Sequence, residues 1–301
     1  MRFSTPLRYP GGKGKLTGFI KKTIKDNDLE GCSYVEPYAG GAGVALSLLY
    51  DGYVSSIHLN DLNRSIYAFW HSALYENDAL CDLIERTSIT MDEWNLQRAV
   101  QDNAEGKPLL ELGFSTFFLN RTNRSGIIKG GVIGGKGQLG KWTLDVRFNK
   151  ADLIKRLHKI KEFKDRVFIY NHDAAFLLKN VIPKLKSKTL VYLDPPYYVK
   201  GQGLYQNFYQ HDDHVEISNI IKEKLNASWI VSYDAAPEII EMYENENKII
   251  YGLHYSAQKK HVGSEVMFFS EDLLIPAVEN PSKIKPNRSK SKTLQVIGVP
   301  E

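Results

Sequence analysis

Cysteine is scarce in this sequence, since its 301 residues include only Cys32 and Cys81. Two cysteines do not form a disulfide scaffold, and a reducing cytoplasm is the default expectation. No stretch approaches the run of about 18 apolar residues that a membrane helix needs, so no membrane partner is expected. The residues from Met1 to Pro6 also lack the apolar segment of a secretory leader. These absences favour a cytoplasmic globular protein.

Two nucleotide-binding fingerprints are missing as well. The Gly-rich turn that ends in Lys13 has no following Ser or Thr at P-loop spacing. Gly41 and Gly43 could open a dinucleotide fingerprint, but Leu46 stands where its last glycine belongs, so a nicotinamide enzyme is disfavoured. His211 and His214 are better explained as a polar helix start than as metal ligands, and no metal site is predicted.

Positive charge is concentrated rather than abundant. The formal net charge is only +4. Between residues 121 and 147, however, six lysines and arginines stand against one acid, Asp145. Residues 283–292 are basic as well and contain no acid. Such blocks suit a polyanionic partner, although a solvated loop and, for the tail, a disordered segment are the alternatives.

The two ends of the chain have the pattern of an α/β domain. Residues 15–25 and 42–50 are expected to form helices, and 33–36 and 55–59 to form strands, which gives a βαβ unit and a parallel, doubly wound sheet. After residue 150, strands are expected at 166–170, 189–193, 229–233 and 266–269, with helical segments between them, for example at 215–225.

The middle of the chain changes character. Residues 62–149 begin with helical periodicity and end in a stretch, 125–140, where glycines alternate with apolar residues. That stretch predicts a β-hairpin or a long loop. We therefore divide the chain into an α/β domain in two parts, residues 1–61 and 150–278, an insertion at 62–149 and a flexible basic tail at 279–301.

The sharpest local signal is the sequence Asp194-Pro195-Pro196-Tyr197, which follows an apolar run. Ligands bind beyond the carboxyl ends of the strands in open α/β sheets, and two prolines force the backbone out of the sheet. The Asp194 carboxylate and the Pro195 carbonyl could accept both N–H groups of an adenine N6 amine, and Tyr197 could stack on the extruded base. A strand end closed by a Pro-Pro turn is the structural alternative.

A Gly-rich turn follows the first predicted strand, in Glu36-Pro37-Tyr38-Ala39-Gly40-Gly41-Ala42-Gly43. Glycines there allow close backbone approach to a ligand. Asp61 lies about 20 residues further on, at the next strand end, where an acid binds the ribose of an adenosine-bearing cofactor. Lys13 lies in a Gly-rich turn and could bind a carboxylate near the cofactor. A basic loop at the start of a helix, without a ligand, accounts for this lysine equally well.

Taken in this order, the motifs resemble the Dam-like, D12 class of DNA adenine-N6 methyltransferases. The matching pieces cover roughly residues 7–270: Tyr9-Pro-Gly-Gly-Lys13, Glu36-Pro-Tyr-Ala-Gly-Gly-Ala-Gly43, Asn60-Asp61, Phe118-Leu-Asn-Arg121 with the Gly-rich stretch, and Asp194-Pro-Pro-Tyr197. The resemblance implies the Rossmann-like fold of S-adenosylmethionine-dependent methyltransferases, with a mixed, mainly parallel sheet and an inserted helical plus β-hairpin target-recognition domain.

The resemblance also implies roles for particular residues. The catalytic loop would be Asp194, Pro195, Pro196 and Tyr197. Residues that would contact S-adenosylmethionine are Tyr9, Lys13, Pro37, Tyr38, Gly40, Asp61, Asp173 and Asp194. Asp61 would bind the ribose and Asp173 the adenine, although the aromatic residue that usually neighbours this acid is displaced to Phe176 and a helix N-cap is the alternative for Asp173.

The insertion would carry the contacts to double-stranded DNA. Asn120, Arg121, Asn123 and Arg124 lie where that family meets DNA, and Arg and Asn can make bidentate contacts to guanine and adenine. Lys129, Lys136 and Lys141 are interpreted as phosphate contacts, with a solvated role as the alternative for each.

The sequence also has to be compared with the requirements of other functions. A cytosine-C5 enzyme needs a nucleophilic cysteine after a proline, and neither Cys32 nor Cys81 fits. A cytosine-N4 enzyme usually has Ser where Asp194 stands. Methylation of RNA or of a protein glutamine, and a non-catalytic DNA-binding protein, are further alternatives. We expect a monomer, and a cognate restriction endonuclease is a possible partner.

Overall fold

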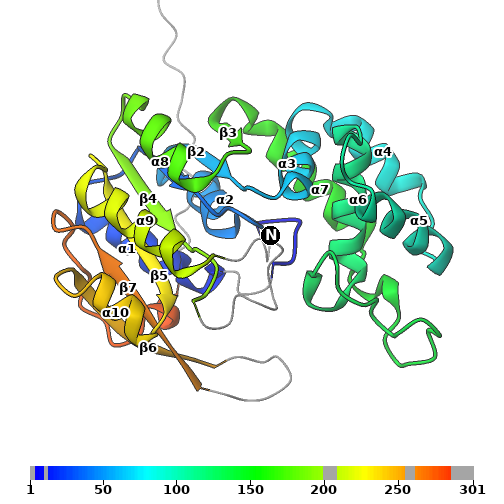
Figure 1. Ribbon diagram of the computed structural model, residues 1–301. Helices are drawn as coiled ribbons and strands as arrows, with labels where there is room; N and C mark the ends of the chain where they lie inside the picture. Colours follow the sequence, from blue (N-terminus) through cyan, green and yellow to red (C-terminus); the bar gives the residue numbers. More distant parts are fainter. Residues whose placement is uncertain (1–3, 10–12, 199–208, 255–261, 286–301) are drawn as a thin grey trace, which may run out of the picture.

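The computed structural model describes residues 4–9, 13–198, 209–254 and 262–285. Over these residues one seven-stranded sheet runs through the molecule with helices on both faces (Figure 1). The strands lie in the order β3-β2-β1-β4-β5-β7-β6. They are β1 (Cys32–Glu36), β2 (Val54–Asn60), β3 (Val167–Tyr170), β4 (Thr189–Leu193), β5 (Ser228–Asp234), β6 (Asn247–His254) and β7 (Val262–Phe269).

The sheet is mixed and mainly parallel, which confirms the predicted fold class. Strands β1 to β5 pair in parallel, and β7 pairs antiparallel with both β5 and β6. All residues of β1 and β4 are buried, as expected of central strands covered on both faces. The chain leaves β1 toward β2 and leaves β4 toward β5, so the strand order reverses between β1 and β4. Open α/β sheets bind ligands at such a switch point, beyond the carboxyl ends of the strands.

Helices cover both faces of the sheet. Apolar side chains of α1 and α2 pack on one face, and those of α8, α9 and α10 pack on the other (Figure 1). The helices are α1 (Thr17–Asp26), α2 (Gly43–Tyr50), α3 (Arg64–Tyr75), α4 (Asn77–Arg86), α5 (Met91–Asp102), α6 (Leu109–Thr122), α7 (Lys150–Glu162), α8 (Ala174–Asn180), α9 (His211–Glu223) and α10 (Pro237–Met242). None of these described helices is both long and apolar enough to cross a bilayer.

The middle of the chain forms a helical block beside β2 and β3 (Figure 1). Helix α6 packs against α3 and α5 and is buried along most of its length. The Trp70 indole on α3 donates to the Gly40 carbonyl at 3.0 Å, which ties the block to the loop after β1. Helix α7 packs against α3 and α4, although the predicted boundary at residue 149 would separate it from them.

The Gly-rich stretch after α6 is a long loop, so the β-hairpin alternative is wrong. Among the described residues, its only β pairing is an isolated bridge between Asn123 and Val132. Positive φ angles at Ser125, Gly126, Gly134, Gly135 and Gln138 turn the chain too often for two paired strands. The Gln138 side chain closes part of the loop by bonding the Ile133 and Gly135 carbonyls and the Leu144 N–H.

The predicted flexible tail begins too early. Residues 281–283 form a 3₁₀ turn, η7 (Pro281–Lys283), that contacts α1. A Cβ atom on Gly18 would lie 2.3 Å from the Ile284 carbonyl oxygen, so the glycine permits this close approach. The prediction of a flexible tail is therefore wrong for residues 279–285, and residues 286–301 lie outside the described residues.

Candidate active site

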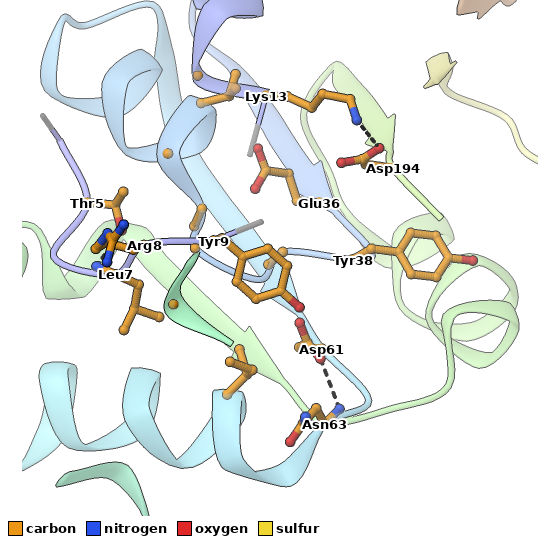
Figure 2. Close-up of a pocket in the computed structure, with 18 of the residues that line it drawn as sticks. Thr5, Leu7, Arg8, Tyr9, Lys13, Glu36, Tyr38, Asp61, Asn63 and Asp194 are labelled. Carbon is orange, nitrogen blue, oxygen red and sulfur yellow. Dashed lines mark hydrogen bonds and ion pairs between the residues drawn. The ribbon is translucent and has the colours of Figure 1, made fainter. Parts of the chain in front are cut away.

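A cavity of about 1330 Å³ opens at the switch point of the sheet. Its walls come from the N-terminal segment, the loops after β1, β2 and β4, and the loop after α6. Figure 2 shows Lys13 and Asp194 together at one side of this cavity, Tyr9 and Asp61 near its middle, and Arg8 at the other side. Tyr9, Lys13, the turn at residues 36–43, Asp61 and Asp194 therefore meet in one place.

Lys13 and Asp194 form a buried ion pair. The Lys13 Nζ lies 2.8 Å from Asp194 Oδ1, and the Ser232 hydroxyl donates to the same oxygen at 3.2 Å. Burial alone would lower the pKa of Lys13, but the carboxylates of Asp194 and Glu265 raise it well above its ordinary value. Lys13 is therefore a permanent cation. Asp194 Oδ2 receives no hydrogen bond from a described residue, and Asp194 lines the cavity.

Tyr197 is part of the same buried network. Its hydroxyl accepts from Lys13 Nζ at 3.0 Å and donates to Glu265 Oε1 at 2.7 Å, and its side chain is only 5% exposed. Tyr197 is not among the residues that line the cavity, so stacking of its ring on a base stays a prediction. Its hydroxyl links the loop after β4 to β7.

Glu265 on β7 is the residue that sequence reasoning missed. It is 1% exposed, its Oε1 lies 3.9 Å from Lys13 Nζ, and the Tyr251 hydroxyl donates to its Oε2 at 2.9 Å. A glutamate inside the apolar strand 262–269 is a polar residue at a core position, and such a residue needs buried partners. That anomaly was the signal in the sequence, but it did not identify Lys13 and Tyr197 as the partners.

The turn after β1 meets Asp61 at the end of β2. The Gly40 N–H donates to Asp61 Oδ2 at 3.0 Å, and the Asn63 N–H donates to Oδ1 at 2.9 Å. Gly40 has φ +45°, and a Cβ atom there would lie 2.7 Å from the Tyr9 ring. Burial raises the pKa of Asp61 to about 6, with the two N–H donors opposing the rise, so the carboxyl is ionised at neutral pH. Tyr9 points toward Asp61 (Figure 2).

Other predicted cofactor residues occupy different positions around this turn. Pro37 and Tyr38 line the cavity, and the Tyr38 hydroxyl lies 2.9 Å from that of Tyr209. Asp173 is exposed and caps α8, where its carboxylate accepts from the Ala175 N–H at 2.8 Å. The N-cap alternative for Asp173 is therefore observed, and its contact with a cofactor stays a prediction. Glu36 also faces the cavity, and burial raises its pKa to about 8.

Two of the predicted base-contacting residues are buried structural links. The Asn120 amide accepts from the Arg8 N–H at 2.7 Å and donates to the Arg8 and Gly126 carbonyls. The Asn123 amide accepts from the Trp94 indole at 2.7 Å and donates to the Ile127 and Ile128 carbonyls. Both side chains are 0% exposed. In this structure their hydrogen-bonding groups are used inside the protein, which favours a structural role, and a contact with DNA stays a prediction.

The predicted cations of the insertion divide into two kinds. Arg121 lines the cavity, and its Nε and Nη2 both donate to the Arg147 carbonyl, so that edge is not available for a bidentate contact to guanine. Burial lowers the pKa of Arg121 to about 9, helped by neighbouring arginines. The remaining four are exposed along the loop that follows α6: Arg124, Lys129, Lys136 and Lys141.

The strand order and the cavity at its switch point define a Rossmann-like α/β protein with a ligand site beyond the carboxyl ends of its strands. The chain belongs to the D12 class N6 adenine-specific DNA methyltransferase family, whose model matches residues 9–261. It is thus an adenine-N6 DNA methyltransferase. The family and fold imply a methyl donor of the S-adenosylmethionine type and a DNA substrate.

Two solved structures show a distant resemblance to the chain. The rRNA methyltransferase aviRa from Streptomyces viridochromogenes is 14% identical, with a TM-score of 0.36 and 84% of each chain covered. Protein LPL1258 from Legionella pneumophila is 12% identical, with a TM-score of 0.34 and coverage of 87% of this chain and 86% of that one. No curated protein matches the sequence.

Proposed function

We propose that this enzyme methylates adenine N6 at a fixed sequence of double-stranded DNA, with S-adenosylmethionine as the donor and Asp194-Pro195-Pro196-Tyr197 as the catalytic loop. One observation carries the proposal: the cavity at the switch point holds an ion-paired Asp194 with one carboxylate oxygen still available. The cavity of about 1330 Å³ also exceeds the 300–1000 Å³ of an ordinary small-molecule site, which suits a donor and a nucleobase together.

The donor fits the part of the cavity around Asp61. The Asp61 oxygens each accept one backbone N–H and keep further acceptor capacity for ribose hydroxyls. The turn at Gly40 brings the backbone close without a side chain, and Tyr9, Pro37 and Tyr38 supply apolar walls. The bound donor would supply a methyl group on a positively charged sulfur. Asp173, at the start of α8, is proposed to contact its adenine.

Asp194 and Pro195 are proposed to hold the target amine. The N6 lone pair is delocalised into the ring, so two acceptors that bind both N–H groups favour a tetrahedral nitrogen with a localised lone pair. Asp194 Oδ2 is one acceptor and the Pro195 carbonyl, which receives no hydrogen bond from a described residue, is the other. Burial raises the pKa of Asp194, and Lys13, which binds Oδ1, fixes the carboxylate and opposes that rise. The amine attacks first and loses its proton afterwards, so no strong base is required.

Extrusion of the adenine is part of the proposal, because N6 is unreachable for this chemistry inside a stacked duplex. The exposed cations after α6, with Lys129, Lys136 and Lys141 as phosphate contacts, would hold the flanking duplex. We further propose that one copy of the chain is sufficient, because Lys13, Asp61 and Asp194 all come from the same chain. A cytoplasmic location and a cognate restriction endonuclease remain expectations.

The experiment is single-molecule sequencing of DNA from cells that express the chain in a methylation-free host. The expected result is N6-methyladenine at one fixed motif, absent from cells that express Asp194→Ala. N4-methylcytosine instead would overturn the choice of base but not the fold or the donor. No modified base at all, together with no binding of S-adenosylmethionine by the purified protein, would overturn the proposal.

A further inference from the structure

Four arginines gather at the end of the cavity away from Lys13. Arg8, Arg121, Arg147 and Arg156 all line it, although they come from the N-terminal segment, α6, the 3₁₀ turn η3 (Leu144–Arg147) and α7. They converge on residues 5–8, because Arg121 donates to the Pro6 and Arg147 carbonyls and Arg156 donates to the Thr5 carbonyl at 2.9 Å. The neighbouring arginines also help to lower the pKa of Arg121. Packing segments so distant in sequence around like charges is unfavourable unless an anion joins them.

The protein supplies little negative charge to this arginine cluster. Among the described residues one carboxylate, Asp152, forms an ion pair with it, through Arg156. Arg121 donates to the Arg147 and Pro6 carbonyls, which are neutral acceptors. Arg8 is the least satisfied member, since its Nη1 is buried and no described residue accepts a hydrogen bond from it. A buried guanidinium donor without an acceptor is uncommon and calls for an explanation.

The backbone of Arg8 is held firmly, which argues against a disordered side chain at a mobile terminus. Asn120 binds both the N–H and the carbonyl of Arg8, at 2.7 and 2.6 Å. Gly126 covers it from the loop after α6, since a Cβ atom there would lie 2.3 Å from the Arg8 carbonyl oxygen. The buried Asn120 thus presents Arg8 at a fixed place in the cavity wall.

We infer that the cluster of Arg8, Arg121, Arg147 and Arg156 is a binding site for a single phosphate of the DNA backbone, beside the nucleotide that enters the cavity. Guanidinium groups match the oxygens of a phosphate in geometry and charge, and several around one anion distribute its charge. The exposed loop after α6 continues the positive charge outward from the cluster through Lys129, which also lines the cavity. This inference rests on the proposed function, because it takes DNA as the ligand.

The donor's carboxylate is the competing source of negative charge. A carboxylate and a DNA phosphodiester each carry one negative charge, so the number of cations does not distinguish them. The basic rim does, because a DNA strand also brings further phosphates to the exposed cations after α6, whereas the donor brings a single anion. The arginines therefore bind the DNA strand, and cofactor affinity is not expected to depend on them.

The test compares the wild-type protein with Arg8→Gln on an unmethylated duplex that contains the sequence at which the enzyme forms N6-methyladenine. Each phosphate near the target adenine is replaced in turn by a neutral methylphosphonate. For the wild-type protein, one substitution is expected to weaken binding by about tenfold or more, the size of a charge-assisted hydrogen bond. For Arg8→Gln, affinity for the unmodified duplex is expected to fall by a similar factor. The methylphosphonate that weakens wild-type binding should then have almost no further effect on binding by the variant. In Arg8→Gln, the slope of the logarithm of the binding constant against the logarithm of the salt concentration should also decrease in magnitude by about one.

Two controls distinguish phosphate binding by Arg8 from a general loss of positive charge and from a structural role. Arg86→Gln removes one exposed charge from α4 and should keep the coupling to that phosphate. Thermal unfolding of Arg8→Gln should occur at the same or a higher temperature, because the variant removes an unsatisfied buried donor, whereas a purely structural role predicts a loss.

Three outcomes would overturn the inference. The first is that every methylphosphonate weakens binding by Arg8→Gln as much as it weakens binding by the wild type. The second is that the variant loses affinity for S-adenosylmethionine instead of DNA. The third is that inorganic phosphate stabilises the wild type without such coupling. Formation of N6-methyladenine by the wild type tests the proposed function separately.

Discussion

The two ends of the cavity differ in how their charged side chains are paired. At the catalytic end, Lys13 is buried with Asp194 at 2.8 Å and Glu265 at 3.9 Å, and the hydroxyls of Tyr197 and Tyr251 bind the same glutamate. At the other end, four arginines share one ion-paired carboxylate, and Arg8 keeps a buried donor that no described residue satisfies. Among the described residues, the Lys13 end thus has two carboxylates for one cation, and the arginine end has one ion-paired carboxylate for four cations.

This difference indicates a division of work. A buried charge network that binds one oxygen of Asp194 holds this carboxylate, the proposed acceptor for the amine, in one position before substrate arrives. Like charges held close together destabilise the protein alone, and in our proposal a DNA phosphate supplies the counter-charge of the arginine cluster. The catalytic end is therefore expected to govern the rate, and the arginine end the affinity for DNA.

The largest effect should follow from replacing Asp194. In Asp194→Asn an N–H donor takes the place of one acceptor for the amine, so we expect the rate of methyl transfer to fall by about 10³-fold, comparable to the loss of an oxyanion-hole donor. DNA affinity should change little, because Lys13 keeps Glu265 as a counter-charge. Single-turnover assays and DNA titrations measure the two quantities. An Asp194→Asn enzyme with near wild-type turnover would remove Asp194 from the mechanism.

A smaller loss of rate is expected for Glu265→Gln. The variant keeps the shape but removes one of the two negative charges around Lys13, and it weakens the hydrogen bond from Tyr197. We expect kcat to fall by about 10- to 100-fold, the effect of a misplaced catalytic group, with the KM for DNA unchanged. Exposed Glu271→Gln, just past the same strand, is the control. If Glu265 only stabilises the fold, kcat measured well below the unfolding temperature will stay at the wild-type value.

The buried amides should affect stability rather than sequence choice. Asn120→Ala and Asn123→Ala each leave buried backbone groups without partners, and we expect the free energy of unfolding to fall by about 1–3 kcal/mol for each. The exposed Asn103→Ala should change it by less than about 0.5 kcal/mol. Chemical denaturation and sequencing of methylated DNA provide the two measurements. A changed recognition motif at unchanged stability would instead indicate that these residues contact bases.

Much of the fold was predictable because its signals are local. Residues 189–193 form an apolar run ended by two prolines, and the observed β4 has the same bounds. The turn at residues 36–43 and Asp61 were placed correctly at one edge of the sheet because parallel strands end together. Strand β6 was missed because this edge strand begins with the polar residues Asn247 and Lys248 and its uninterrupted apolar run, residues 249–251, is only three residues long.

The sequence did not reveal partners that lie far away along the chain. Asn120 bonds a residue 112 positions earlier, and Glu265 bonds a tyrosine 68 positions earlier. An asparagine in a basic segment has the same sequence signature whether its amide faces a base or a buried carbonyl. Only the packing of α6 against the N-terminal segment decides between them, and the arginine cluster arises from the same packing.

The most direct test of this division is to measure both quantities for Asp194→Asn and Arg8→Gln on one DNA duplex. Single-turnover methylation at saturating DNA gives the rate of the chemical step, and equilibrium titration gives the affinity. We predict that Asp194→Asn loses the rate and keeps the affinity, whereas Arg8→Gln loses affinity and keeps the rate once DNA is saturating. If both variants lose both quantities to a similar degree, the two ends of the cavity do not have separate tasks and the proposed division of work is wrong.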